Sequence, residues 1–526
     1  MRKKILTLLA AVFALTAIHA QTEVYNRNRL LDDYFRFLLH VESSYVDTVN
    51  LKQLIVNNVK ETLKQLDPHS AYLSEQELKQ SQEHLSGEFE GIGVQYQMTN
   101  DTLYIIQTIS GCPAERAGLR PGDKIVSVGD SVIAGVKITN TRIQKLLRGP
   151  RGTLVTVGVM RNGIKEPLTF TLKRDKIPML SVDASYMAAP QVGYIKINSF
   201  GAKTYEEFMD AWGGLKKQKA TKLILDLRSN GGGYLTSAQQ IVNEFLRLGD
   251  LITYTEGIHQ RRQVLVADGK GQLKDVPVVV LVDEYSASAA EIVSGAIQDW
   301  DRGTIIGRRT FGKGLVQRQF PAPGEGAYRL TVSRYYTPSG RCIQKPYKNV
   351  DYKDDINQRY KHGEMTNADS IHFADSLKYY TLRKSRVVYG GGGIMPDIFI
   401  PADTSRYTPY ENRVTAQGII LDVSAQLTDS LRSAITHKYK TYAQYAEYFT
   451  VPASAIEKVD HLAAEKDLKP DTDEELLKAH EGISRQLKAL VARNIWNYTG
   501  YFYVVNSQSD VYQKALEVLQ QDRATP

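Results

Sequence analysis

The chain has 526 residues and a formal net charge of +8, from 66 Lys and Arg against 58 Asp and Glu. This length allows three or four domains, and the mild charge, with no Lys/Arg run interleaved with aromatics, argues against nucleic-acid binding. The ten histidines show no metal-type spacing, so no metal site is expected. The two cysteines, Cys112 and Cys342, could form a disulfide or remain as two thiols, and the sequence leaves both options open.

The N-terminus has the pattern of a secretory signal peptide. Residues 2–4 are basic, residues 5–17 are apolar, and Ala20 precedes the expected cleavage site. The apolar run is too short to span a bilayer comfortably, and no other stretch is long and apolar enough. We therefore expect residues 1–20 to be removed and the mature protein to be exported and soluble, in the periplasm or cell envelope or secreted.

Two segments with different periodicities follow. Apolar residues recur at helical spacing between Leu30 and Leu66, so residues 21–87 are predicted to be helical. Residues 88–176 contain short alternating runs, which predict a small β-rich domain. Its Gly91–Val94 loop precedes a strand; the simplest alternative is a hairpin that uses the glycines only for its turn.

From residue 177 onwards strands alternate with helices, which predicts a parallel sheet with right-handed crossovers. Val192–Ile197 and Lys222–Arg228 are predicted strands, and the glycine-rich turn Ser229–Gly233 follows the second. The run Val276–Val282 is apolar and β-branched, as in a fully buried strand. Sites in such sheets lie at the carboxyl ends of the strands, so the residues after these strands are candidates.

A strand-to-helix turn after Val282 exposes a hydroxyl near the free N–H groups of the next helix. A nucleophile whose intermediate carries an oxyanion needs this setting. Ser286 and Ser288 are the two candidates, and the alternative is that one of them simply caps the helix.

Downstream, Lys313 stands between two glycines. Gly307–Lys313 matches a phosphate-binding loop up to its last position, but Gly314 occupies the place of the Mg²⁺-binding Ser or Thr, and a strand follows. The other use of a lysine beside an exposed serine is as its general base. Only the neutral amine can act in this way, so burial and apolar neighbours must lower its pKa.

Together these residues resemble the C-terminal processing peptidases, a family of serine proteases with a Ser–Lys dyad. The family pattern is a Ser-Ala-Ser-Ala-type turn, then Phe-Gly-Lys-Gly, then a Gln shortly after the Lys. Here this pattern falls on Ser288, Lys313 and Gln317, and the interval between the first two selects Ser288 over Ser286. The run Leu225–Gly233 matches the family's second signature, although the family usually has Pro at the position of Gly231.

The resemblance, which covers about Leu30 to Pro401, implies a multidomain α/β protein. Its core would be a crotonase-like α/β protease with an inserted PDZ domain and helical N- and C-terminal regions. The implied parts are a signal peptide (1–20), an N-terminal helical region (21–87), a PDZ domain (88–176), a protease core (177–405) and a C-terminal helical region (406–526). We identify no chemistry in the last of these parts.

The resemblance also implies the role of each site residue. Ser288 would be the nucleophile, Lys313 the general base and Gln317 the group that orients the lysine. The oxyanion would be bound by the N–H groups of Gly232, with an uncertainty of one position, and of Ala289. The PDZ domain would add a peptide C-terminus to its sheet as an extra strand, in an apolar pocket. The residues expected at its carboxylate are Gly91, Ile92, Gly93 and Val94.

The sequence thus predicts an exported serine endopeptidase that recognises unstructured C-terminal tails and needs no metal or organic cofactor. Self-association into a homo-oligomer stays open. One alternative is a non-catalytic PDZ scaffold that binds peptides, against which the intact Ser288, Lys313 and Gln317 weigh. A crotonase-like acyl-group enzyme is a second alternative, and the PDZ insertion and the dyad argue against it.

Overall fold

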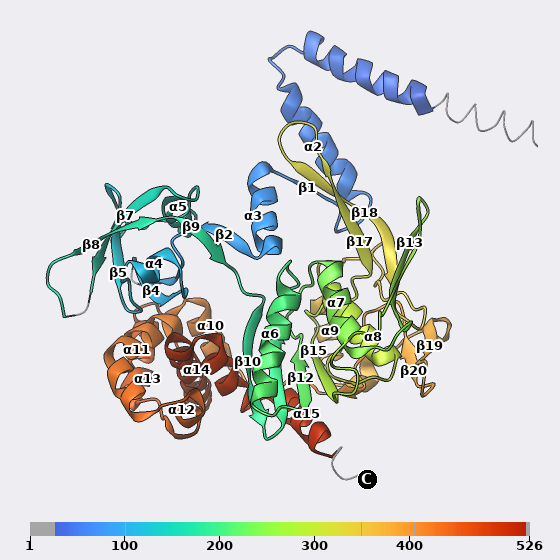
Figure 1. The fold of residues 1–526 in the computed structure, drawn as a ribbon. Helices are drawn as coiled ribbons and strands as arrows, with labels where there is room; N and C mark the ends of the chain where they lie inside the picture. Colours follow the sequence, from blue (N-terminus) through green and yellow to red (C-terminus); the bar gives the residue numbers. More distant parts are fainter. Residues whose placement is uncertain (1–26, 100, 162, 349, 404–405, 522–526) are drawn as a thin grey trace, which may run out of the picture. The chain divides into compact units, whose positions relative to one another are not determined.

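The computed structural model describes residues 27–521, apart from residues 100, 162, 349 and 404–405 (Figure 1). The predicted signal peptide, residues 1–20, lies outside the described residues. The chain divides into two compact units. The first contains residues 1–78 and 317–331, and the second contains residues 79–316 and 332–526.

In the first unit, a helix and a short strand are joined by a turn built on Asp67. α2 (Leu51–Lys64) ends shortly before Asp67, whose Oδ1 accepts two amides of the next turn (2.8 and 2.9 Å). The chain then enters β1 (Ala71–Leu73), which pairs antiparallel with the first residues of β18 (Ala327–Tyr336). The sequence predicted only helices here; β1 is set by a partner strand far along the chain. α3 (Glu75–Ser86) follows.

The segment predicted as a PDZ domain folds around its own core. Its six-stranded sheet has the order β3-β4-β5-β7-β8, with β6 paired to β5. α5 (Asn140–Leu147) buries Ile143 and Leu147 against the sheet, and the short α4 (Pro113–Arg116) buries Ala114. The strands are β3 (Val94–Thr99), β4 (Thr102–Thr108), β5 (Lys124–Val128), β6 (Ser131–Val132), β7 (Leu154–Met160) and β8 (Leu168–Lys173).

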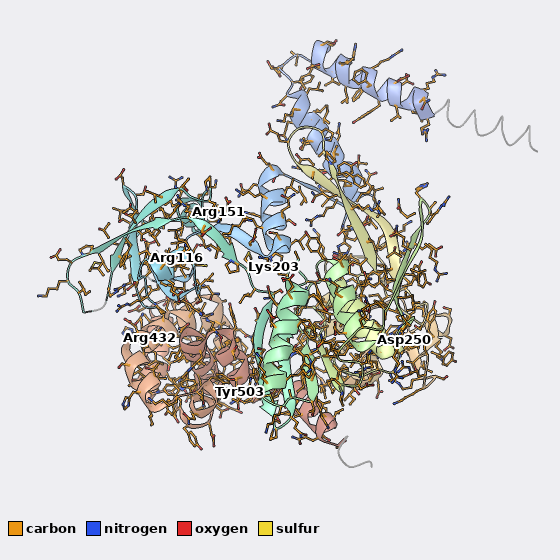
Figure 2. All side chains as sticks on the ribbon, in the orientation of Figure 1. Arg116, Arg151, Lys203, Asp250, Arg432 and Tyr503 are labelled. Atoms are coloured by element: carbon orange, nitrogen blue, oxygen red, sulfur yellow. The ribbon has the colours of Figure 1, made fainter. Side chains whose placement is uncertain are left out.

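The chain enters and leaves this fold through one strand pair. β2 (Glu88–Gly91) runs antiparallel to β9 (Asp175–Pro178). Asp175 forms ion pairs with Arg116 (3.4 Å) and Arg151 (2.8 Å), both labelled in Figure 2. Entry and exit lie side by side, as is usual for a domain inserted into a longer chain.

A six-stranded sheet forms the centre of the α/β region, in the order β10-β11-β12-β15-β16-β21. All pairs from β11 to β21 are parallel, as the alternating pattern predicts, whereas β10 is an antiparallel edge strand that the sequence did not reveal. Every residue of β11, β12 and β15 is buried, which explains their apolar sequences. The strands are β10 (Val182–Ala189), β11 (Val192–Ile197), β12 (Lys222–Asp226), β15 (Val278–Val282), β16 (Thr304–Gly307) and β21 (Ile398–Phe399).

Helices cover both faces of this sheet (Figure 1). One face packs against the crossover helices α6 (Thr204–Lys217), α7 (Leu235–Phe245) and α8 (Ala289–Asp299). The other face packs against α15 (Asp510–Gln521), which comes from the C-terminal region. Its buried side chains are Val511, Tyr512, Ala515 and Leu519.

The C-terminal helical region has a second core around the long helix α14 (Asp473–Asn506). Non-helical backbone angles at Trp496 and Asn497 divide this helix into two parts. The second part leaves the bundle for the sheet, where the Tyr503 ring lies 5.1 Å from that of Tyr186 in β10 (Figure 2). The other helices are α10 (Pro409–Ala416), α11 (Ile419–Lys438), α12 (Tyr442–Tyr448) and α13 (Ala453–Ala464).

Two further groups of elements complete the second unit. β13 (Leu251–Gly257) and β14 (Gln260–Val266) form a hairpin, and β13 also pairs with the end of β18. Residues 350–386 contain short elements followed by one more strand. These elements are α9 (Asp355–Lys361), the 3₁₀ turns η1 (Ala368–Ser370) and η2 (Asp375–Leu377), and the strands β19 (Lys378–Tyr380) and β20 (Val387–Tyr389).

Both cysteines are free thiols in this structure, Cys112 buried and Cys342 partly buried. Of the two options that the sequence left open, the structure therefore has the unpaired one. No helix among the described residues has the length and apolar character that crossing a bilayer requires.

Candidate active site

The turn after β15 is built on Asp283. Its Oδ1 accepts the amide of Ser286 (3.1 Å), and the Ser286 hydroxyl donates to the carbonyl oxygen of Leu227 at the end of β12 (2.8 Å). Ser286 is completely buried, so its hydroxyl holds the turn. Ser288, which is only partly buried, stands at the N-cap of α8.

Ser288 has a strained backbone, with φ 54° and ψ −112°. A non-glycine residue in such a region costs about 1–3 kcal/mol and persists only where its surroundings fix it. The fixing contact is the hydrogen bond from the Ser288 amide to Glu291 Oε2 (2.8 Å). Because strain of this kind gathers at functional sites, it supports Ser288 over Ser286 as the reactive serine.

One buried carboxylate joins the serine turn to the lysine segment. Glu291 is fully buried, and its Oε2 accepts the amides of both Ser288 and Lys313, each at 2.8 Å. Its Oε1 accepts the Gly312 amide (2.7 Å) and the Thr310 hydroxyl (2.5 Å). Burial raises the pKa of Glu291 above its ordinary value, and these donors partly counter that rise. We call Glu291 with its four donors the carboxylate clamp; the sequence pattern indicated only the start of a helix here.

The lysine segment is packed closely by two later parts of the chain. A Cβ at Gly314 would lie 2.9 Å from the Gln344 amide nitrogen, and one at Gly393 would lie 2.6 Å from the Thr310 carbonyl oxygen. The Gly390–Gly393 run therefore serves close packing. The segment continues into the strand β17 (Leu315–Pro321), whereas a phosphate-binding loop would continue into a helix.

Gly232 lies directly against the serine turn. Its φ is +98°, and a Cβ there would lie 2.7 Å from Ser288 Cβ and 3.0 Å from the Ala289 amide nitrogen. The structure thus brings together three of the residues predicted for the site. Ala289 is the first residue of α8, where N–H groups lack an intrahelical partner.

Asn230, which the sequence did not single out, holds the glycine turn. It is fully buried, and its Nδ2 donates to the Ile197 carbonyl oxygen at the end of β11 (2.9 Å). Its own carbonyl oxygen accepts the Ala287 amide (2.9 Å), and its Oδ1 accepts the Gly232 amide (2.9 Å). Asn230 therefore connects the glycine turn with β11 and with the serine turn. Its Oδ1 accepts the Gly232 N–H, which was predicted to bind the oxyanion.

Gln317 belongs to the first unit, whereas Ser288 and Lys313 belong to the second. Within the first unit, Gln317 Nε2 donates to the carbonyl oxygen of His69 (2.5 Å). The orienting role of Gln317 toward Lys313 stays a prediction.

The predicted carboxylate-binding loop lies between β2 and β3. Gly93 has φ +81°, and a Cβ there would lie 2.4 Å from Cys112 Cβ, so only glycine fits. Gly91 ends β2 and Val94 begins β3. Ile92 is only 2% exposed and belongs to the domain core, so it packs inward at this loop.

These arrangements offer a defined chemistry. A hydroxyl on a strained turn and an amine on the adjoining segment are the groups that nucleophilic catalysis uses, and N–H groups at a helix start suit an oxyanion. Among the described residues, no three His, Cys, Asp or Glu side chains gather where they could hold a metal ion.

Comparisons with known proteins cover the same regions. Residues 191–356 match peptidase family S41, residues 91–173 match the PDZ domain, and residues 410–497 match a family of unknown function. The chain is 34% identical to a carboxy-terminal-processing protease of Bartonella bacilliformis over 356 residues, which are 65% of this chain and 81% of that protein. It is 32% identical to the carboxy-terminal processing protease CtpB of Bacillus subtilis over 333 residues, 61% of this chain and 66% of that protein. A solved photosystem II D1 C-terminal processing protease aligns at 25% identity, with a TM-score of 0.36, over 71% of this chain and 87% of that chain.

Proposed function

The chain belongs to peptidase family S41, with the carboxy-terminal processing proteases, and we propose that it cleaves proteins through Ser288 and Lys313. It is a serine-type peptidase with a PDZ domain. Ser288 is the nucleophile in this proposal, and Lys313 is its general base.

The carboxylate clamp carries the assignment of the two residues. Its Oε2 accepts the backbone amides of both Ser288 and Lys313, so the two chain segments are held together at those residues. Preorganisation of this kind is what a nucleophile and its base require, because misplacement by about 1 Å can cost about a hundredfold in rate.

The reaction follows from these roles. Ser288 Oγ attacks the scissile carbonyl carbon while the neutral amine of Lys313 takes the hydroxyl proton. The ammonium then gives this proton to the leaving amine as the peptide C–N bond breaks, which leaves an ester on Ser288. Water, deprotonated by the same lysine, hydrolyses the ester, and the proton returns to Ser288.

The oxyanion is bound by the N–H groups of Gly232 and Ala289 in this proposal. The closeness of Gly232 to Ser288 and Ala289 supports it. When substrate binds, the Gly232 N–H must leave Asn230 Oδ1 and donate to the oxyanion instead. Donors to an oxyanion usually supply the largest single part of catalysis, and loss of one costs about 10²–10³ in kcat.

We assign unstructured protein C-termini as the substrates, bound through the Gly91–Val94 loop of the PDZ domain. Addition of a peptide as an extra strand gives affinity through main-chain hydrogen bonds. Gly93, where packing against Cys112 leaves no room for a side chain, supports a loop with a fixed backbone at this place.

The main alternative is a scaffold that binds peptides without cleaving them. A scaffold has no need of the strained serine or of a buried carboxylate that binds the Lys313 amide. These features, with the family membership, favour the peptidase.

We further propose that the protein is exported and that residues 1–20 are its leader. Mass spectrometry of protein purified from the native envelope is expected to show a chain that begins near Gln21. A chain that retains Met1 would contradict export by this route. Ultracentrifugation of the same sample would establish whether it forms a homo-oligomer.

The deciding experiment compares wild type, Ser288→Ala and Ser286→Ala on an unfolded test protein, with products identified by mass. Ser288→Ala is expected to release no products. Ser286→Ala is expected to retain cleavage, with a loss that reflects only a weakened turn, because its hydroxyl bonds to the Leu227 carbonyl. Cleavage by Ser288→Ala at the wild-type rate would overturn the proposal.

A further inference from the structure

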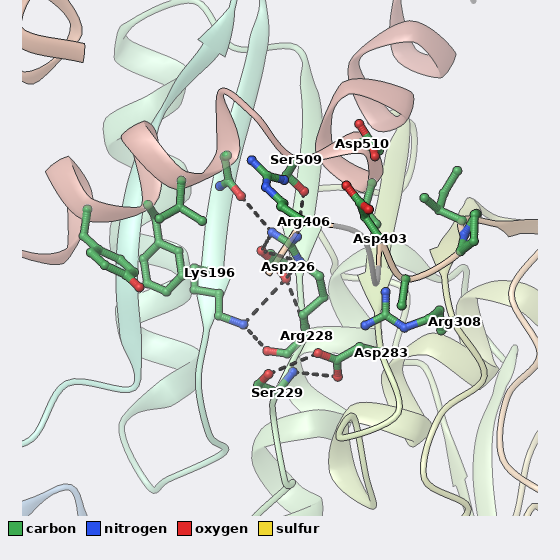
Figure 3. Close-up of a pocket in the computed structure, with 18 of the residues that line it drawn as sticks. Lys196, Asp226, Arg228, Ser229, Asp283, Arg308, Asp403, Arg406, Ser509 and Asp510 are labelled. Carbon is green, nitrogen blue, oxygen red and sulfur yellow. Dashed lines mark hydrogen bonds and ion pairs between the residues drawn. The ribbon is translucent and has the colours of Figure 1, made fainter. Parts of the chain in front are cut away.

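Arg228 connects the C-terminal helices with the carboxyl edge of the main sheet. Its guanidinium donates to Asn506 Oδ1 at the end of α14 (2.8 Å) and to Ser509 Oγ before α15 (3.1 Å). Figure 3 shows Arg228 among Asp226, Lys196 and Ser509. Asn506 is fully buried, and its Nδ2 donates to the Tyr186 hydroxyl of β10 (2.9 Å).

Arg228 in turn belongs to a buried ionic network. Its Nε and Nη2 donate to both oxygens of Asp226 (2.6–3.1 Å), and Asp226 also accepts the Tyr194 hydroxyl (2.6 Å). Burial alone would raise the pKa of Asp226, but Arg228 and Lys196 lower it below its ordinary value. Lys196 also donates to the Arg228 carbonyl oxygen, so both ends of this residue are held.

The residue after Arg228 begins the glycine turn. Ser229 has φ 56°, a second strained serine, and its amide donates to Asp283 Oδ1 (2.8 Å). The same oxygen accepts the Ser286 amide in the serine turn. A continuous chain of contacts therefore runs from Asn506 through Arg228 to both turns of the candidate active site.

We propose that the C-terminal helices take part in catalysis, with Asn506 and Ser509 as positioning residues that hold Arg228, and through it the turn Ser229–Gly233, in the reactive geometry. The inference rests on the proposed function, in which Gly232 binds the oxyanion.

Two observations separate this role from simple coverage of the sheet. An apolar side chain at position 506 would cover the sheet equally well, whereas the buried amide of Asn506 has hydrogen-bond partners at both ends. In addition, Arg228 borders a cavity of about 590 Å³ that Asp403 and Asp510 also line (Figure 3). Without Asn506, the guanidinium has space and other carboxylates to move toward.

The test uses three variants of the full chain, each of which replaces one buried asparagine. Asn506→Leu removes the acceptor for Arg228 at similar volume, whereas Asn506→Asp keeps an acceptor and serves as the rescue. Asn494→Leu is the matched control, because Asn494 is also buried in α14 but donates to Thr428 inside the C-terminal bundle (3.1 Å).

Asn506→Leu is expected to lower kcat on a short peptide by about 10- to 100-fold, with KM changed by less than about threefold. Hydrogen–deuterium exchange should become faster in the peptide covering residues 226–234. Asn506→Asp should recover most of kcat, and Asn494→Leu should lower the melting temperature without either effect. If Asn506→Leu does not fold, Ser509→Ala should show a smaller loss of kcat and the same faster exchange.

Two results would overturn the inference: unchanged exchange and kcat in Asn506→Leu and Ser509→Ala, or equal loss of kcat in Asn494→Leu. Ser288→Ala measured alongside separates this outcome from a failure of the proposed function. If Ser288→Ala is active, the assignment of the Ser–Lys dyad is wrong. If Ser288→Ala is inactive and Asn506→Leu is fully active, only the proposed role of the C-terminal helices is wrong.

Discussion

The two loops whose glycine N–H groups we propose as donors are held in different ways. The Gly91–Val94 loop is fixed by packing of Ile92 in the domain core and of Gly93 against Cys112, and by main-chain hydrogen bonds to the Ile92 and Gly93 carbonyl oxygens. The Ser229–Gly233 loop is fixed by polar and charged groups, among them Asp283 on the Ser229 amide and the side chain of Asn230.

The difference matches the two tasks that we assign. A loop that receives a preformed carboxylate needs only the right shape, which packing supplies. A loop that stabilises a charge for the short life of a transition state must already point its dipoles correctly, and directional hydrogen bonds fix such orientation. We therefore expect substitutions near Ser229–Gly233 to affect chemistry and substitutions near Gly91–Val94 to affect binding.

The largest effect is expected at Lys313, on the chemical side of this comparison. Lys313→Ala should lose turnover on the order of a thousandfold or more, because Ser288 loses its base. Lys313→Arg should be equally inactive, since a guanidinium stays protonated. Peptide cleavage should rise with pH to a plateau in wild type and be absent in both variants.

Tail binding and circular dichroism are the controls for Lys313, and both should match wild type. Substantial cleavage by Lys313→Arg would contradict the base assignment. Magnesium-dependent nucleotide binding by wild type would restore the phosphate-loop interpretation.

Gly232→Ala is expected to follow: it keeps the N–H but displaces it from Ser288, and we expect a loss of about 10²–10³ in kcat, as for a lost oxyanion donor. The added Cβ would lie 2.7 Å from Ser288 Cβ, at a φ of +98°. Gly231→Ala is the matched control, because nothing lies within 4 Å of a Cβ there. Steady-state kinetics on a short peptide measures both. Equal losses in the two variants would show that the turn as a whole, and not the N–H of Gly232, is sensitive.

The protonation of Glu291 as pH falls tests whether polar contacts hold the catalytic segments. Burial raises its pKa above 4.5, so the folded protein binds this proton more tightly than the unfolded chain does. As pH falls through the raised pKa, protonation therefore stabilises the fold, but the carboxyl can no longer accept four hydrogen bonds. Hydrogen exchange in residues 310–314 should rise reversibly over this pH range before the protein unfolds; exchange is the readout, because protonation of Lys313 lowers peptidase activity at acid pH in any case.

Glu291→Gln should reproduce this state at neutral pH, with kcat reduced by about a hundredfold. Glu244→Gln is the control, because Glu244 is a buried carboxylate that accepts the Tyr205 hydroxyl and the Gln272 amide away from the site. If exchange in residues 310–314 is the same in Glu291→Gln as in wild type, the clamp does not hold the lysine segment.

The smallest effect on chemistry is expected at Gly93. Gly93→Trp should weaken binding of C-terminal peptides by about tenfold or more, since a side chain there clashes with Cys112 and displaces the loop that we assign to the carboxylate. Cleavage of short peptides should suffer less. Gly111→Ala is the control, because it changes a nearby positive-φ glycine with open space around it. Wild-type affinity for tails in Gly93→Trp, measured by calorimetry, would contradict the loop assignment.

The sequence predicted those parts of the molecule that depend on local pattern. The apolar run at Val278–Val282 is the buried central strand, and the parallel order follows from alternating strands and helices. Gly232 and Ala289 were also predicted, and the structure places both beside Ser288, because a turn and a helix start are local features.

What the sequence did not reveal depends on contacts across long separations. Glu291 has an ordinary helical position, and its importance arises only when the segment of Gly312 and Lys313 returns to it. Arg228 and Asn506 are far apart in the sequence, and no motif in either segment predicts that they form a hydrogen bond. Ile92 was expected beside the peptide carboxylate, and its side chain belongs to the domain core, which the sequence did not indicate.

The helix α15 has a consequence for the synthesis of the protein. One face of the catalytic sheet is closed only when Val511, Tyr512, Ala515 and Leu519 pack against it. A ribosome makes about 5–20 residues per second, N-terminus first, so this face of the sheet stays uncovered until α15 has been made. During that interval Ser288 and Lys313 already exist on the nascent chain, yet the layer that supports their sheet is missing. The support of the catalytic sheet thus depends on a helix, Asp510–Gln521, that lies far beyond Ser288 and Lys313 in the chain.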